Sequence, residues 1–234
     1  MAGTSAEVRP IVATCKGIEV PEAPHFGPGM IRSMGEGRYE GKEIQTGLAV
    51  IPEGARILEM GAGSGIVGAV LAKNCKAEKV VAIEANPELI EHIRHLYTHN
   101  GLDRVMSVRH GVVFTAPEPP ATVEFFLRGN FLGSGLKVVK NPERARPVTV
   151  PVLPYGALKA EFPHDVIVMD IEGAELDFLR HADLTGVNTI ILEVHRDIYG
   201  REGMREIRRL FADAGFALDE EHSKVGVHAY RRAG

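Results

Sequence analysis

The sequence predicts an α/β fold in which helices cover both faces of a mostly parallel sheet and a terminal antiparallel strand pair closes it. Three observations in the 234-residue chain lead to this fold. From residue 56 onward, short apolar runs alternate with segments of helical periodicity. A turn with glycine at three alternate positions follows the first run, and the last two apolar runs have no helix between them.

Composition and charge narrow the classes of function. Hydrophobic residues make up 44% and charged residues 25%, which is typical of one globular domain. The net charge of −4 gives no electrostatic basis for a nucleic-acid partner, and no apolar run is long enough for a membrane partner. The widely spaced Cys15 and Cys75 and the absence of a signal-peptide pattern favour a cytoplasmic location. The oligomeric state stays open, with a homodimer as one option.

The first part of the chain differs in character from the rest. Residues 1–36 are rich in proline and glycine and are expected to form an N-terminal arm. A single domain is expected over residues 37–234, starting with a helix at about 40–49 that Pro52 ends.

The alternating region gives the elements of the sheet in order. Each predicted strand is a short apolar run, and each predicted helix follows it with apolar residues on one side. The strands are expected at 56–60, 79–83, 105–110, 165–170, 188–194, 215–219 and 225–231, and the helices at 65–73, 87–99, 172–181 and 202–214.

A β-rich insertion at about 112–160 interrupts this rhythm. Two β-rich runs, 136–140 and 147–153, predict a hairpin, preceded by a glycine-rich loop. Loops at the carboxyl edge of a sheet tend to bind substrates. We therefore expect a small-molecule substrate to contact loop residues Asn130, Phe131 and Ser134.

The glycine turn after the first strand is the strongest local signal. Its residues are Glu59, Gly61, Ala62, Gly63 and Gly65, and they predict a sharp strand-to-helix turn that a ligand approaches closely. A pattern that starts at Gly61 resembles the S-adenosylmethionine loop of class I methyltransferases. A pattern that starts at Gly63 satisfies the dinucleotide signature G-x-G-x-x-G, so a nicotinamide cofactor remains the alternative.

The ends of the next two strands predict the rest of a cofactor site. Glu84, followed by Ala85, ends the second strand, where a carboxylate can accept both hydroxyls of a ribose. The alternative is that Glu84 only favours the dipole of the following helix. His110 and Gly111 follow the third strand and are expected to border the adenine.

A second set of polar residues follows two later strands. Asp170 and Glu172 come directly after an apolar run, with Glu175 at the start of the next helix, where it can act as a cap. His195 ends the following strand and can take a proton near neutral pH. Asp170 and His195 are the candidate catalytic bases, and Asp170 is also expected to border the cofactor. Glu172 is expected to contact the substrate. No metal is expected, although Asp170 with Glu172 could bind a divalent ion as an alternative.

Four segments together resemble the FkbM family of S-adenosylmethionine-dependent methyltransferases. They are Gly37–Glu40, Glu59–Gly65 with Glu84, Asp170–Glu175 and Leu192–His195. The resemblance covers about residues 37–200 and implies a Rossmann-like class I methyltransferase fold with S-adenosylmethionine as cofactor. It also implies O-methylation of a hydroxyl on a small molecule, a sugar or a natural product. The sequence departs from the family pattern at Val168, where a lysine is usual, and at Tyr155–Ala157, which lacks the usual aspartate.

Two other functions remain open from the sequence. An NAD(P)-dependent oxidoreductase would use the pattern that starts at Gly63, but it leaves the acids between Asp170 and Glu175 unexplained. A non-catalytic binding protein could keep a cofactor fold as a scaffold, since fold alone does not decide function.

Overall fold

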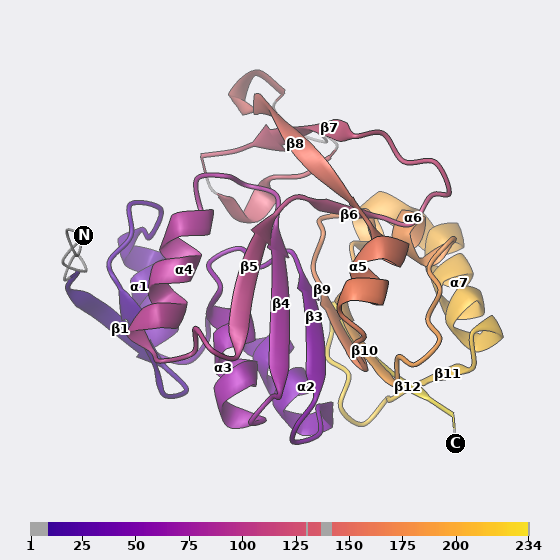
Figure 1. The fold of residues 1–234 in the computed structure, drawn as a ribbon, viewed down its shortest axis with the longest axis horizontal. Coiled ribbons are helices and arrows are strands. Elements are labelled where there is room, and N and C mark those ends of the chain that lie inside the picture. Colours follow the sequence, from indigo (N-terminus) through magenta and orange to yellow (C-terminus); the bar gives the residue numbers. More distant parts are fainter. Residues whose placement is uncertain (1–8, 130, 137–141, 234) are drawn as a thin grey trace.

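The computed structural model describes residues 9–129, 131–136 and 142–233 (Figure 1). Their centre is a seven-stranded sheet with the order β11-β12-β10-β9-β3-β4-β5. Its parallel strands are β3 (Arg56–Met60), β4 (Lys79–Glu84), β5 (Met106–His110), β9 (Val166–Met169) and β10 (Thr189–Glu193). The last two strands, β11 (Phe216–Leu218) and β12 (Val227–Arg232), pair antiparallel, and β12 also runs antiparallel to β10. The predicted fold class is confirmed.

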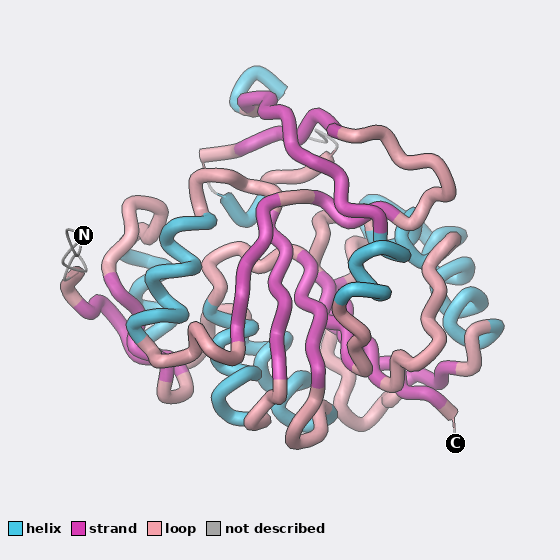
Figure 2. The backbone as a smooth tube through the Cα atoms, viewed as in Figure 1, coloured by secondary structure: helices cyan, strands magenta, loops and turns pink. Residues whose placement is uncertain are grey.

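Helices cover both faces of this sheet, as Figure 2 shows. The helices α2 (Gly41–Val50), α3 (Ile66–Asn74) and α4 (Ile90–His99) share one hydrophobic core, and α5 (Tyr155–Glu161), α6 (Glu175–Leu179) and α7 (Arg196–Asp213) share the other. Side chains of a strand alternate between the faces, so Ile57 enters the first core and Leu58 the second. Strands buried on both faces explain why the sequence shows continuous apolar runs.

Two helices differ from their predicted bounds for local reasons. The helix expected at 172–181 is limited to α6, because Glu172 and Gly173 have left-handed φ values of 51° and 96°. The helix expected at 202–214 begins earlier, at Arg196, and Gly200 interrupts it with a φ of 61°. None of the helices in the described parts of the chain combines the length and apolar content needed to span a bilayer.

The N-terminal segment packs on the first core. The strands β1 (Ile11–Cys15) and β2 (Ile18–Pro21) form a hairpin, and α1 (Pro28–Gly35) follows. Cys15, Ile18 and Val20 are buried in the same core as α3 and α4. The segment predicted as an arm therefore contains a folded hairpin and a helix from residue 11 onward.

The insertion forms a separate small sheet over the carboxyl edge of the main sheet (Figure 1). It consists of β6 (Val112–Phe114), β7 (Thr122–Leu127) and β8 (Arg146–Pro154), and two short 3₁₀ turns, Phe131–Gly133 and Pro142–Arg144, lie between β7 and β8. Among the described residues, β8 pairs antiparallel with β7 and parallel with β6. Residues 137–140 of the other predicted run, 136–140, lie outside the described residues.

Candidate functional site

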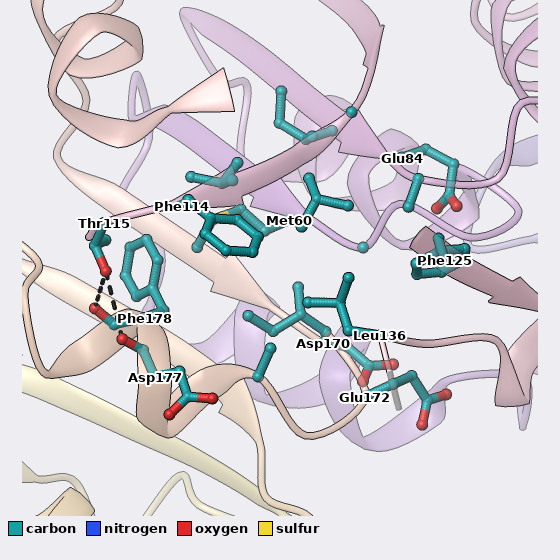
Figure 3. Close-up of a pocket in the computed structure, with 18 of the residues that line it drawn as sticks. Met60, Glu84, Phe114, Thr115, Phe125, Leu136, Asp170, Glu172, Asp177 and Phe178 are labelled. Carbon is teal, nitrogen blue, oxygen red and sulfur yellow. Dashed lines mark hydrogen bonds between the residues drawn. The ribbon is translucent and has the colours of Figure 1, made fainter. Parts of the chain in front are cut away.

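A cavity of about 400 Å³ lies at the carboxyl ends of β3, β4 and β9, beneath the insertion. Figure 3 shows Glu84 on one side of this cavity and Asp170 with Glu172 on the opposite side. The parallel strands bring these three acids together although they are far apart in sequence. Predicted site residues that line the cavity are Gly61, Gly63, Glu84, Ala85, Gly111, Phe131, Ser134, Asp170 and Glu172.

The three glycines of the turn have different physical roles. A Cβ on Gly61 would lie 1.7 Å from the backbone oxygen of Asp170, and one on Gly65 would lie 2.9 Å from Ile93. Among the described residues, a Cβ on Gly63 would meet only the Phe131 ring, at 3.4 Å. Packing of the protein on itself therefore requires Gly61 and Gly65, whereas Gly63 leaves space on the cavity side.

The carboxylate of Glu84 holds the turn from the neighbouring strand. Its Oε2 accepts a hydrogen bond from the Gly63 N–H at 2.7 Å, and its Oε1 accepts one from the Asn86 N–H at 2.7 Å. Burial raises the pKa of Glu84 to about 7. Glu84 is thus a positioned acceptor at the cavity wall, as well as a brace for the turn.

Four other residues predicted to bind a cofactor lie behind the cavity wall. Glu59 is buried beside Gly68 and lines a smaller adjoining pocket together with Ala62. Burial raises the pKa of Glu59 to about 8. His110 contacts the Ala85 backbone oxygen at 3.0 Å through Nε2, so its ring supports the chain next to the cavity. Gly65 is at the start of α3.

The second set of acids surrounds His195. The ends of β9 and β10 are adjacent, because these strands pair in parallel register. His195 Nε2 lies 3.3 Å from Glu172 Oε2 and 3.8 Å from Asp170 Oδ1, and its Nδ1 lies 3.2 Å from Glu175 Oε1. Burial opposes the charge on His195, but the carboxylates outweigh it and raise its pKa to about 11. Burial and neighbouring carboxylates raise the pKa of Asp170 well above its usual range.

Additional acids from the start of the domain line the smaller pocket. Glu40, directly before α2, and Glu43, on α2, face this pocket. Glu193 faces it from the end of β10. Burial and neighbouring carboxylates raise the pKa of Glu40 to about 7. Within the described part of the chain, no lysine or arginine lines this pocket. The pocket is therefore strongly acidic.

The sequence prediction missed this contribution from the start of the domain. The Tyr39 hydroxyl donates a hydrogen bond to Ser64 Oγ at 3.1 Å, which ties the segment before α2 to the glycine turn. In the sequence, the segment Gly37–Glu40 stood out only as part of the family resemblance. No other feature of the segment indicated that it contributes to the site.

The predicted loop residues form part of the roof. Phe131 packs edge-on against His25, with ring centroids 5.1 Å apart, and Ser134 Oγ accepts a hydrogen bond from the Arg128 N–H at 3.0 Å. Asn130 lies outside the described residues. The far end of the cavity was not predicted, and there Thr115 donates a hydrogen bond to the backbone oxygen of Phe178 at 2.9 Å (Figure 3).

Comparison with known proteins identifies the family. The profile described as Methyltransferase FkbM domain matches residues 59–218, which is more than half of the chain. The chain belongs to the FkbM methyltransferase family. The match spans the glycine turn and both sets of acids, so the resemblance stated from the sequence is confirmed.

Individual relatives are distant. A putative methyltransferase from Jannaschia sp. (strain CCS1) is 24% identical over 188 residues, which cover 73% of this chain and 65% of that protein. A ribosomal protein L11 methyltransferase from Paraburkholderia xenovorans (strain LB400) is 33% identical over 90 residues, covering 38% of this chain and 27% of its own length. The chain therefore spans less than two thirds of either relative. A protein of the NADB-Rossmann superfamily from Streptococcus agalactiae has a similar fold, with a TM-score of 0.50, 16% identity and coverage of 82% of this chain and 68% of its own.

Family membership decides between the two cofactor classes. The domain is an S-adenosylmethionine-dependent methyltransferase domain. The described residues fit this cofactor, because Glu84 offers a buried carboxylate at the cavity wall that could accept ribose hydroxyls and Gly63 leaves the turn open. Gly111 and Val112 offer an apolar wall for the adenine.

The raised pKa of Glu84 predicts how cofactor affinity changes with pH. Ribose hydroxyls donate to the ionised carboxylate, so Glu84 must lose its proton when ligand binds below a pH of about 7. Affinity for S-adenosylhomocysteine is expected to be full above pH 7 and to fall below it, by up to about tenfold per pH unit. Titration calorimetry from pH 5.5 to pH 8.5 measures this slope. In the Glu84→Gln variant, affinity at pH 8 should be about tenfold weaker, and the slope below pH 7 should disappear. An unchanged slope in this variant would assign the proton to another group.

Proposed function

We propose that this protein transfers a methyl group from S-adenosylmethionine to a hydroxyl of a small molecule, such as a sugar or another natural product. One observation carries this proposal. The cavity that fits the cofactor is lined on the side opposite Glu84 by Asp170 and Glu172. An acceptor hydroxyl in that position would lie between the cofactor and carboxylates that can orient it and take its proton.

Residues that line the cavity would hold the cofactor and place the acceptor. The backbone of the turn at Gly61 and Gly63 and the carboxylate of Glu84 would hold the cofactor, with the roof at Phe131 and Ser134 closing over it. S-adenosylmethionine, when bound, supplies a methyl group on a sulfonium and leaves as S-adenosylhomocysteine. The protein therefore has to place the acceptor oxygen in line with that methyl group and to remove one proton.

Asp170 is the better placed of the two candidate bases. Its Oδ1 is buried and faces His195, which leaves Oδ2 as the oxygen that can meet an acceptor in the cavity. The acceptor oxygen forms the new bond to the methyl carbon, and its proton passes to Oδ2. His195 does not line the cavity and is enclosed by carboxylates, so we assign it a positioning role.

The shape and charge of the site favour a small acceptor. The insertion covers the cavity, and acidic residues line the pocket next to it. Phosphate-rich nucleic acid is repelled by such a surface. The Paraburkholderia relative is described as acting on ribosomal protein L11, so a protein acceptor is the second candidate.

The cofactor part of the proposal predicts a thermal shift. S-adenosylhomocysteine at about 100 times its Kd should stabilise the native protein by about 2.7 kcal/mol, which raises the Tm by about 5–10 °C. NAD at the same concentration should leave the Tm unchanged and serves as the control. Stabilisation by NAD alone would refute the proposed function.

The acceptor class is tested with radiolabelled S-adenosylmethionine. Label should pass to members of a panel of hydroxylated small molecules, and not to total tRNA or to ribosomal protein L11. Transfer to L11 would replace the small-molecule proposal. Cofactor binding without transfer to any acceptor in the three sets would support the non-catalytic alternative.

A further inference from the structure

Three residues behind the cavity have the composition of a cation site. Asp170 follows β9, Glu175 begins α6 and His195 follows β10. One possible ligand atom from each residue lies within 4.8 Å of those from the other two. Small rotations of the side chains would bring such atoms to the separations found around a single bound ion.

Each of these three residues also has a buried atom without a hydrogen-bond partner. These atoms are Asp170 Oδ1, Glu175 Oε2 and His195 Nδ1. The Glu175 side chain has an exposed fraction of 0%, and its other oxygen, Oε1, already accepts hydrogen bonds from the N–H groups of Ile171 and Gly173. A carboxylate oxygen that is buried without a partner is costly. Two such oxygens, Asp170 Oδ1 and Glu175 Oε2, beside a His195 Nδ1 whose nearest partner is Glu175 Oε1 at 3.2 Å, indicate a missing ligand.

The charge of the surroundings indicates the sign of that ligand. Glu172 Oε2 lies 3.3 Å from His195 Nε2, and Glu40 and Glu193 line the adjoining pocket. A single imidazolium cannot balance this many carboxylates, whereas a divalent cation can. Carboxylate-rich sites with few nitrogen ligands suit Mg²⁺ or Mn²⁺.

We propose that Asp170, Glu175 and His195 bind a divalent cation of the Mg²⁺ or Mn²⁺ type, with Glu172 at the open side of the ion. The role of this site rests on the proposed function. A cation at Asp170 Oδ1 adjoins the cavity, where it can bind the acceptor hydroxyl and lower its pKa. The hydroxyl proton then passes to Asp170 Oδ2, the oxygen bonds to the methyl carbon, and the carbon–sulfur bond breaks with its electron pair left on sulfur.

Manganese binding tests the site without reference to activity. The purified protein is treated with EDTA, desalted and titrated with Mn²⁺, and free Mn²⁺ is measured by electron paramagnetic resonance. We expect one Mn²⁺ per chain, displaced by Mg²⁺. Glu175→Gln and His195→Ala should each weaken Mn²⁺ binding by at least about tenfold. Glu193→Gln, which removes a neighbouring charge but no proposed ligand, should weaken Mn²⁺ binding less than either ligand variant does.

The outcomes separate this inference from the proposed function. Absence of Mn²⁺ binding at millimolar concentration in the wild-type protein would overturn the cation site, as would equal binding by Glu175→Gln and the wild type. The thermal shift with S-adenosylhomocysteine, measured on every variant, shows that each is folded. If that shift and methyl transfer persist in EDTA, the cation site fails and the proposed function stands. If Mn²⁺ binds as expected but S-adenosylhomocysteine does not, the proposed function fails.

Discussion

Replacing Asp170 by asparagine is expected to lower the rate of methyl transfer by about 10²–10⁴-fold, the usual effect of losing a group that takes up a proton in catalysis. The change preserves the shape of the side chain but removes its negative charge. Affinity for S-adenosylhomocysteine should change little, because the turn and Glu84 are the groups proposed to bind the cofactor. Single-turnover kinetics with labelled cofactor and a panel acceptor give the rate, and calorimetry gives the affinity.

Two comparison variants make this result specific. His195→Ala removes the positioning residue and should change the pH profile of the reaction, not only its rate. Glu161→Gln removes a surface acid at the end of α5 that pairs with Arg109 of β5, and it should leave kcat unchanged. Turnover by Asp170→Asn at the wild-type rate would remove this residue from the catalytic site and leave it a structural role.

Gly61→Ala is expected to have the largest effect on stability. The added Cβ would lie 1.7 Å from the Asp170 backbone oxygen, and the φ of +84° disfavours any residue with a Cβ. Overpacking and left-handed strain together predict a loss of about 3–5 kcal/mol in the free energy of unfolding. Urea unfolding followed by circular dichroism measures this loss.

Gly63→Val provides the contrast within the same turn. The Cβ at this position has only the Phe131 ring nearby, so the variant should fold with a strain cost of about 1–2 kcal/mol. Its branched side chain would fill the space on the cavity side, and the thermal shift with S-adenosylhomocysteine should disappear. Equal stability loss in the two variants, or cofactor binding by folded Gly63→Val, would show that the two glycines do not have separate roles.

The sequence predicted those parts of the site in which a titratable side chain follows directly after a strand. Glu84, Asp170 and His195 each come at the end of an apolar run, and parallel strands place such residues at one edge. The site residues Tyr39 and Glu43 were not predicted, because long-range contacts such as the hydrogen bond between Tyr39 and Ser64 bring their segment to the turn.

The errors in the predicted elements also have physical causes. Helical periodicity continued through Glu172 and Gly173, but their left-handed backbone conformation limits α6 to Glu175–Leu179. The pairing of β8 with β7 and β6 depends on contacts between distant segments, which local propensity does not determine. The apolar pattern of residues 147–153 identified β8 as a strand. The same pattern could not show that β8 pairs with β6 and β7.

The contact between Gly61 and Asp170 has a consequence for how this family can change its acceptors. The Asp170 N–H donates a hydrogen bond to the Met60 backbone oxygen at 3.0 Å, and the Asp170 backbone oxygen occupies the space beside Gly61. The turn proposed to hold the methyl donor and the residue proposed to take the proton are therefore joined through main chain, so their separation does not depend on a side chain. Acceptor specificity would then be set by the insertion and by the segment before α2, whereas the backbone would fix the distance across which the methyl group moves.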